Sequence, residues 1–205
     1  GQSQGGGAAI NSAWWANRLT AGTGLDYRGV VATGTPANIE RLVMEAGPDL
    51  PPKQVPPAAI SYASYIVAAL REAHPDTPVD EVLTPRGREL ADRAETVCKT
   101  ELDKRVAGTT LNELFSAPVG SLPGIAAALD SFMGTPTDGY DRPIFLGHGL
   151  QDTDVPPQST QTLYQQLVDN HQNVELHIYP DQDHSGTVLA SMPDSTRFLH
   201  QVMAG

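Results

Sequence analysis

The sequence predicts an α/β fold, in which a mostly parallel sheet is flanked by helices and interrupted by a helical insertion. Two observations lead to this prediction. Both ends of the chain alternate short apolar runs with helical patterns, whereas the middle contains helical patterns only. With 205 residues, of which 40% are hydrophobic, the chain is long enough to bury a sizeable core. We therefore expect residues 1–50 and 136–205 to form the α/β core and residues 51–135 to form the insertion.

The N-terminal zone begins with an Ala-rich stretch at residues 5–19, which predicts a helix. The run GVVATG at residues 29–34 is apolar, β-branched and bounded by glycine, as a buried strand would be. Pro36 is expected to open a second helix, which Gly47 and Pro48 end. This order is the α/β alternation on which the fold prediction rests.

The middle zone opens with the helix-breaking segment PDLPPKQVPP and contains no convincing strand. Its apolar periodicity predicts three helices, roughly at residues 58–73, 85–106 and 122–133. The C-terminal zone returns to alternation, with strands at residues 143–147 and 174–179 and helices at residues 158–170 and 187–203.

The charge balance argues against nucleic acid or an anionic membrane as the natural partner. The chain has 24 acidic and 13 basic residues, a formal net charge of −11, and no cluster of Lys and Arg. No apolar run approaches the roughly 20 residues of a transmembrane segment. The N-terminus also lacks the basic-then-apolar pattern of a signal peptide.

The single cysteine, Cys98, allows two interpretations. It is either a buried thiol or one half of a disulfide whose partner lies outside this chain. A buried thiol is favoured, because cysteine behaves as a small hydrophobic residue.

The first five residues, GQSQG, match the pattern G-x-S-x-G, in which a sharp turn between a strand and a helix exposes a serine hydroxyl. The small residues that follow would let the predicted helix pack closely beneath such a turn. The positive end of the helix dipole would then stabilise negative charge that develops next to Ser3. Because only three positions of the pattern are fixed, a flexible glycine-rich terminus is an equally good explanation when the pattern stands alone.

Two further candidates follow the predicted strands near the C-terminus. Asp152 comes shortly after the first of these strands, at the edge where α/β sheets place their sites. His184 lies in the loop between the second strand and the last helix. The order Ser3, Asp152, His184 is the order of nucleophile, acid and base that distinguishes α/β-hydrolases from other triad folds.

Other polar residues are expected to be structural. His148 is expected to form a hydrogen bond near the loop that carries Asp152. Asp181 and Asp183 flank His184, but no second ligand at a metal-like spacing accompanies them, so we expect solvated loop positions and no metal site. An apolar stripe in the middle zone fits either core packing or an acyl pocket: Ile60, Tyr62, Tyr65, Ile66 and Leu70.

The chain resembles the fungal and bacterial secretory lipases of the α/β-hydrolase superfamily. The resemblance is carried by GQSQGGGAA, by GLDYRGVVATGTPANIERL, and by HGLQDTDVP and DQDHSG near the C-terminus. It extends over nearly the whole chain and is weakest in the middle zone. It implies an α/β-hydrolase fold, a helical cap at residues 51–135 over an acyl-chain tunnel, and a secreted protein.

The resemblance also implies a role for each candidate. Ser3 matches the nucleophile, Asp152 the acid of the D-x-x-V-P motif, and His184 the base ahead of the final helix. The backbone N–H of Gln4 would donate to the oxyanion. Asp154 is a competing acid, but the motif spacing favours Asp152, and Asp154 is expected to cap the turn or the next helix.

These residues predict a carboxylic ester hydrolase, a lipase or esterase, that acts on small-molecule or lipid esters through an acyl-enzyme and serves lipid degradation. This chemistry needs no metal or organic cofactor. Two alternatives remain open. A serine peptidase of the prolyl-oligopeptidase type has the same triad order, and a non-catalytic binding module would keep the fold without a reactive serine.

The region before Ser3 leads to one more expectation. Only three convincing strands can be predicted, and no strand precedes Ser3 in this sequence. A sheet that began at this turn would expose an unpaired edge. We therefore expect an upstream segment of the same precursor that supplies the missing N-terminal strands, a second oxyanion donor, any signal peptide and a candidate disulfide partner for Cys98.

Overall fold

A computed structural model describes residues 1–50 and 57–204, which form two compact units. The first unit combines Gly1–Asn38 with Thr135–Gly205, and the second unit is Ile39–Gly134. The first boundary lies earlier in the chain than predicted, because the helix that follows Asn38 packs against other helices of the second unit. Most of the predicted breaker PDLPPKQVPP lies outside the described residues.

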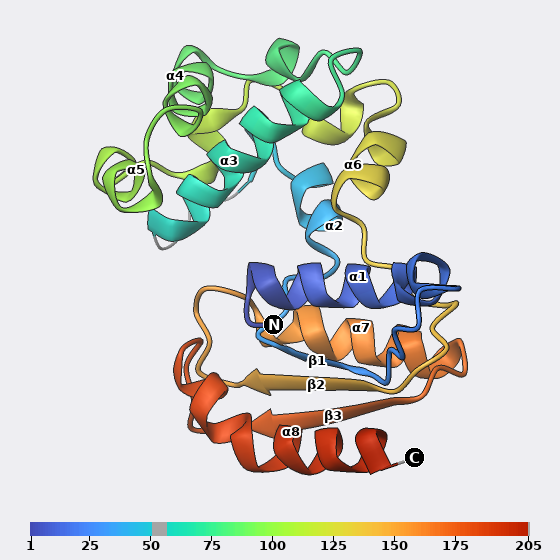
Figure 1. The fold of residues 1–205 in the computed structure, drawn as a ribbon. Helices are drawn as coiled ribbons and strands as arrows, with labels where there is room; N and C mark the ends of the chain where they lie inside the picture. The colour runs from blue at the N-terminus through green and yellow to red at the C-terminus, as the bar shows by residue number, and fades with distance from the viewer. Residues whose placement is uncertain (51–56, 205) are drawn as a thin grey trace. The chain divides into compact units, whose positions relative to one another are not determined.

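The first unit contains a sheet of three parallel strands in the order β1-β2-β3 (Figure 1). The pairing of β1 with β2 begins at Val30 and Ile144, and the pairing of β2 with β3 begins at Ile144 and Val174. All six residues of the central strand are buried, as expected for a parallel strand covered on both faces. The strands are β1 (Val30–Thr33), β2 (Ile144–Gly149) and β3 (Val174–Tyr179).

Helices cover both faces of this sheet. Helices α1 (Gln4–Thr20) and α7 (Pro157–Asp169) lie on one face, and α8 (Gly186–Ala204) lies on the other (Figure 1). The strands and helices of this unit lie within a few residues of their predicted positions, so the predicted α/β alternation is confirmed. The core on the α1 and α7 side includes Ile10, Ala13, Val30, Ala32, Ile144, Leu146, Leu163 and Leu167.

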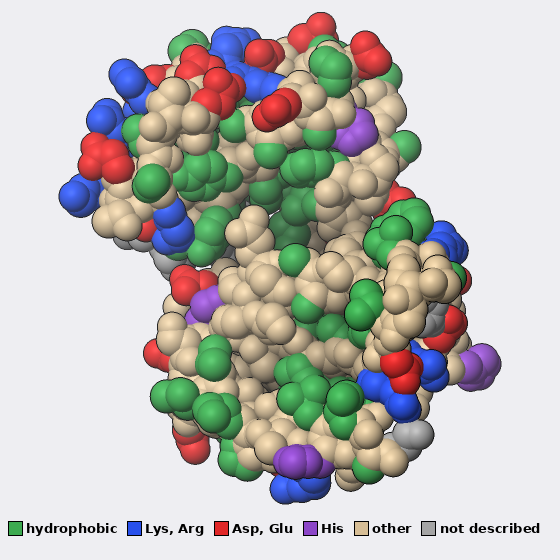
Figure 2. All heavy atoms as spheres, viewed as in Figure 1, with side chains coloured by type: hydrophobic (Ala, Val, Ile, Leu, Met, Phe, Trp, Pro, Cys, Tyr) green, Lys and Arg blue, Asp and Glu red, His purple; other side chains and the backbone are tan. Residues whose placement is uncertain are grey.

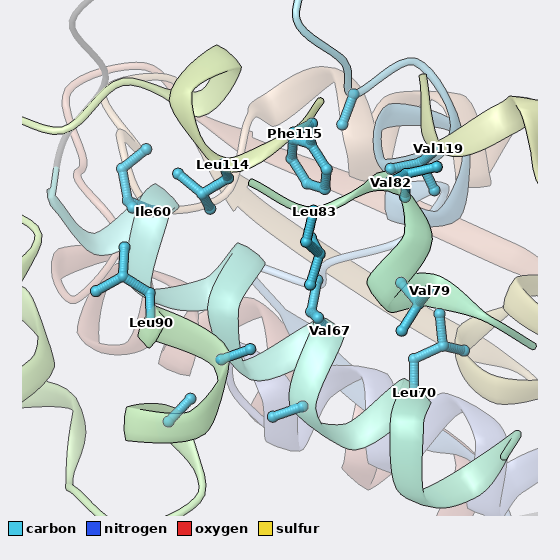
Figure 3. Packing of buried hydrophobic residues seen from close by; sticks show 14 of the residues in the cluster. Ile60, Val67, Leu70, Val79, Val82, Leu83, Leu90, Leu114, Phe115 and Val119 are labelled. Carbon is cyan, nitrogen blue, oxygen red and sulfur yellow. The ribbon is translucent and has the colours of Figure 1, made fainter. Parts of the chain in front are cut away.

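The second unit is helical, and its described residues contain no strand beyond an isolated bridge between Leu83 and Phe115. Figure 3 shows how its apolar side chains pack into a core of their own, and Figure 2 shows acidic and basic side chains intermixed on its visible surface. Its α-helices are α2 (Ile39–Met44), α3 (Pro57–Ala73), α4 (Pro85–Ala94), α5 (Lys99–Arg105) and α6 (Ile125–Met133). Its short 3₁₀ helices are η1 (Val79–Val82), η2 (Leu111–Leu114) and η3 (Val119–Ser121).

The prediction of one continuous helix at residues 85–106 is wrong. Helix α4 ends at Ala94, and α5 starts separately at Lys99 with an extended Cys98 as its N-cap. The thiol of Cys98 is free and the residue is exposed, so the prediction of a buried thiol is also wrong.

Two helices begin later than predicted, each because the residue before it has a positive φ. The helix expected from Pro36 begins at Ile39, because Asn38 has φ 58°. The third helix of the middle zone begins at Ile125, after Gly124 with φ 75°. Within residues 1–50 and 57–204, no helix combines the length and the apolar character needed to cross a membrane.

Candidate active site

Ser3 forms the turn between an extended segment and helix α1. Gln2 pairs with Thr33 of β1 in the parallel direction, and Ser3 N–H donates to Thr33 O at 2.9 Å. Helix α1 begins at the next residue, so the chain changes direction at Ser3, which has φ 56° and ψ −127°. This backbone conformation is strained for a residue with a Cβ, and such strain is typical of the serine in a G-x-S-x-G turn.

The start of α1 provides a free N–H group next to this serine. Gln4 is the first helical residue, so its N–H has no acceptor within the helix, and no other described residue accepts a hydrogen bond from it. A Cβ on Gly6 would lie 2.8 Å from Thr35 Oγ1, so glycine is what allows α1 to pack this closely against the segment after β1. The N-terminus of α1 therefore presents positive partial charge beside Ser3.

Asp152 lies in the tight loop after β2, and its side chain is completely buried. Its Oδ1 accepts the backbone N–H groups of Asp154 at 2.9 Å and Val155 at 2.8 Å. Its Oδ2 lies 2.6 Å from His184 Nδ1. Because this carboxylate oxygen is an acceptor, we assign the Nδ1 proton to His184, which leaves Nε2 with a lone pair that can accept a proton.

Asp154 is placed differently from Asp152. Its side chain is exposed, and its backbone N–H serves the Asp152 carboxylate. Helix α7 has no side-chain hydrogen bond at its N-terminal cap, so the helix cap expected from Asp154 is not formed.

The loop that carries His184 is tied to the turn that carries Ser3. Gln2 Nε2 donates to His184 O at 2.7 Å, and the other side-chain atom of Gln2, Oε1, accepts from the hydroxyl of Thr33. Gly34 has φ 53°, and a Cβ at this position would lie 3.1 Å from His184 Cε1. The histidine ring therefore sits directly against the end of β1.

Among the described residues, no hydrogen bond joins the Ser3 hydroxyl to His184. The structure brings together the turn bearing Ser3, the N–H of Gln4 and the hydrogen-bonded pair of Asp152 and His184 within the first unit.

A second histidine contacts the same acid. His148 Nε2 lies 3.1 Å from Asp152 Oδ2, and its Nδ1 lies 2.6 Å from Thr160 Oγ1. The ring of His148 is fully buried, so it cannot reach a substrate, whereas the side chain of His184 is 15% exposed. His184 is therefore the histidine that can exchange a proton with a bound molecule.

The sequence predicts a hydrogen bond of His148 near the acid loop but not its contact with the carboxylate itself. The four-residue spacing between His148 and Asp152 was the only available signal for that contact. The contacts of Gln2 and Thr160 have no such signal, since neither residue belongs to a recognised motif position.

The acidic residues beside His184 have a structural explanation. Asp183 Oδ1 accepts the N–H of Gly186 at 2.7 Å, so Asp183 caps α8, and Asp181 is exposed. No group of three or more His, Cys, Asp and Glu side chains is placed to hold a metal ion in the part of the chain that the structure describes.

Comparison with solved structures decides the fold. Candida antarctica lipase A matches with a TM-score of 0.71 and 20% identity, over 100% of this chain and 48% of that protein. Its closed state matches with a TM-score of 0.66 and 19% identity, over 96% of this chain and 47% of that one. The chain has the α/β-hydrolase fold.

A third α/β-hydrolase match is the rice cell wall degrading esterase LipA from Xanthomonas oryzae, with a TM-score of 0.66 and 15% identity, over 94% of this chain and 53% of that protein. The chain thus spans about half the length of the structures that it matches. The model of the prolyl oligopeptidase family matches residues 132–203, and a comparison with curated protein sequences gave no match. The predicted α/β-hydrolase fold is confirmed, and the secretory lipase branch stays a prediction.

Proposed function

We propose that the protein is a serine carboxylic ester hydrolase, a lipase or esterase, with Ser3 as nucleophile, His184 as base and Asp152 as the orienting acid. The observation that carries this proposal is the strained backbone of Ser3 at the start of α1, in a turn hydrogen-bonded through Gln2 to the histidine loop. The buried hydrogen bond between Asp152 and His184 supplies an oriented base. The α/β-hydrolase fold supports the same proposal, because its triads follow this chain order.

The proposed reaction begins when His184 Nε2 takes the proton of the Ser3 hydroxyl and the serine oxygen attacks the ester carbonyl carbon. The carbonyl oxygen becomes negatively charged and accepts the free N–H of Gln4. His184 then gives its proton to the leaving alcohol as the carbon–oxygen bond breaks, which leaves an acyl group on Ser3. Water, deprotonated by the same histidine, attacks this acyl-enzyme and releases the carboxylic acid.

The finer parts of the proposal concern the substrate and the location. We propose a lipid ester as substrate, with a role in lipid degradation, and a secreted protein. The resemblance of the motifs to secretory lipases supports these proposals. The second oxyanion donor, expected from an upstream segment, stays a prediction.

We also propose that the helical unit acts as the cap that binds the acyl chain. The unit is inserted in the chain between β1 and β2 and has a hydrophobic core of its own. Replacing residues 39–134 by a Gly-Ser linker should remove a preference for long acyl chains and preserve hydrolysis of short esters. An unchanged acyl-chain preference would exclude the cap role.

The nucleophile is tested by labelling with a fluorophosphonate probe and by hydrolysis of p-nitrophenyl esters. The wild-type protein should label once per chain, and Ser3→Ala should lose both the label and the esterase activity. Ser116→Ala, at an exposed serine of the helical unit, is the control and should keep both. An unlabelled and inactive wild-type protein would instead indicate a binding module.

A second candidate function is a serine peptidase, which the match of the prolyl oligopeptidase family to residues 132–203 favours. This match covers Asp152 and His184 but not Ser3. Turnover of an ester and of an amide with the same acyl group separates the two candidates. Faster turnover of peptides that carry proline before the cleaved bond would support the peptidase.

A further inference from the structure

The carboxylate of Asp152 makes more hydrogen bonds than one imidazole requires. Its Oδ1 is occupied by two backbone N–H groups of its own loop. Its Oδ2 is shared, because it lies 2.6 Å from His184 Nδ1 and 3.1 Å from His148 Nε2. Both carboxylate oxygens are fully buried, so these protein groups, rather than bulk water, hold Asp152 in place.

The surroundings of His148 determine which ring nitrogen carries its proton. Nε2 faces two acceptors, Asp152 Oδ2 and Val155 O, each at 3.1 Å. A lone pair on Nε2 would be repelled by both, so Nε2 carries the hydrogen, which it donates to Val155 O in close contact with Asp152 Oδ2. Nδ1 is then an acceptor, and the hydroxyl of Thr160 lies nearer to it, at 2.6 Å, than to its other acceptor, Thr35 O, at 3.2 Å. Burial lowers the pKa of His148, which keeps this ring neutral with a single N–H.

These groups form one chain of hydrogen bonds on rigid elements. Thr160 lies in helix α7, His148 lies in the central strand β2, and Asp152 lies in the loop directly after that strand. Thr160 contacts His148 Nδ1, His148 Nε2 donates to Val155 O and lies 3.1 Å from Asp152 Oδ2, and His184 Nδ1 donates to the same Oδ2. A displacement of His148 would therefore release Val155 O and remove the close contact with Oδ2, which would leave His184 as the described side chain that holds this oxygen.

We propose that His148 is a positioning residue for the triad: its Nε2–H, hydrogen-bonded to Val155 O and in close contact with Asp152 Oδ2, holds the loop and the carboxylate that orient His184. This inference rests on the proposed serine hydrolase function. His148 does not touch the substrate and acts only through Asp152.

Two substitutions distinguish the effect of the donated hydrogen from the effect of side-chain volume at residue 148. His148→Leu removes the donor and should lower kcat by about tenfold to a hundredfold, with KM little changed, because the base is no longer held in one orientation. His148→Gln can place a side-chain NH₂ near the position of Nε2, where its two hydrogens meet the two acceptors, and should restore most of kcat. His200→Gln, at an exposed histidine of α8, is the control and should change neither.

A second readout is independent of turnover. The proton on His184 Nδ1, hydrogen-bonded to Asp152, should give a low-field ¹H NMR signal whose position reports the strength of that bond. The signal should move in His148→Leu and stay near its wild-type position in His148→Gln. If the leucine variant does not fold, Thr160→Val takes its place, because it removes the hydroxyl that holds the His148 ring at its Nδ1 side.

The outcomes separate this inference from the proposed function. A wild-type protein that neither labels with fluorophosphonate nor hydrolyses esters overturns the hydrolase proposal, while the NMR signal still shows whether His148 holds the pair of Asp152 and His184. Equal kcat and equal NMR signals in the wild type and the leucine variant would overturn the inference. Equal loss in the leucine and glutamine variants, both folded, would also overturn it, because the donated hydrogen would then not matter.

Discussion

Two aspartates of one loop differ in every property that matters for a triad. The Asp152 side chain is fully buried, accepts two backbone N–H groups and contacts two histidines, whereas the Asp154 side chain is exposed. Because both residues are aspartates and lie two positions apart, residue type and position alone do not predict this difference in burial and contacts. The local fold of the loop, which turns one carboxylate inwards, creates the difference.

Asp152→Asn should therefore preserve the fold but lower kcat, by an amount on the order of 10⁴ in the best-known triad, because the amide no longer enforces the Nδ1–H form of His184. Asp154→Asn should stay within a few-fold of the wild type. Steady-state kinetics on one ester measures both, with circular dichroism as the check on folding. Similar losses in the two variants would contradict the assignment of the acid.

His148 also predicts how stability changes with pH. Burial lowers the pKa of His148 from its ordinary value of 6.5 in the folded protein. This effect outweighs those of Val155 O and the Asp152 carboxylate, which both act to raise the pKa. Below pH 6.5 the unfolded chain binds a proton that the folded chain does not bind, so the free energy of unfolding falls as the pH falls towards the folded pKa. The loss amounts to at most about 1.4 kcal/mol per pH unit.

This prediction is checked by urea unfolding of the wild type and of His148→Gln at pH 7, 6 and 5. The variant lacks the titrating ring, so its unfolding free energy should fall less over this range. Asp152 and His184, the titratable groups that face position 148, are present in both proteins and cancel in the comparison. Parallel curves for the two proteins would rule out this contribution.

At the scale of elements, the end of β1 determines where the histidine ring lies. Gly34 has φ 53°, and its missing Cβ leaves the space that His184 occupies. Gly22 also has a positive φ, 75°, but no atom lies within 4 Å of its hypothetical Cβ. Both glycines therefore have a positive φ, but only Gly34 also leaves space for a neighbouring side chain.

Gly34→Ala and Gly22→Ala should each lower the free energy of unfolding by about 1 kcal/mol, because alanine disfavours a positive φ. Only Gly34→Ala should also reduce kcat, by about tenfold or more, because the methyl group displaces the His184 ring. Thermal unfolding and ester kinetics on both variants make the comparison. Equal kcat values in the two variants would show that the position of the His184 ring does not depend on the missing Cβ of residue 34.

The sequence predicted the sheet and its helices well because β-branched runs, proline and glycine mark their limits. It did not predict the break between α4 and α5, since no glycine or proline lies in the intervening segment 95–98. The candidate residues Ser3, Asp152 and His184 came from motif order. The contacts of Gln2, His148 and Thr160 required the fold, because they join segments that are distant in the chain or buried in a strand.

The whole molecule consists of two units, and each has its own hydrophobic core. Leu146 is fully buried in the core of the α/β unit, and Leu129 is fully buried in the core of the helical unit. Neither core includes a residue of the other unit. Their contributions to stability should therefore be local.

Leu146→Ala and Leu129→Ala should each destabilise their own unit by about 2–5 kcal/mol. Hydrogen exchange followed by mass spectrometry should show faster exchange in residues 1–38 and 135–204 for the first variant, and in residues 57–134 for the second. Faster exchange across both units in either variant would show that they unfold as one cooperative body.

The exposed thiol of Cys98 has a practical consequence. The sequence contains one cysteine and two tryptophans, and Trp14 and Trp15 both lie on α1. A maleimide dye would therefore attach at a single position in the helical unit, while both tryptophans lie in the α/β unit. Energy transfer from the tryptophans to the dye would measure the separation of the two units in solution, and would show whether it changes when an ester or an acylating inhibitor is added to test Ser3 as the proposed nucleophile.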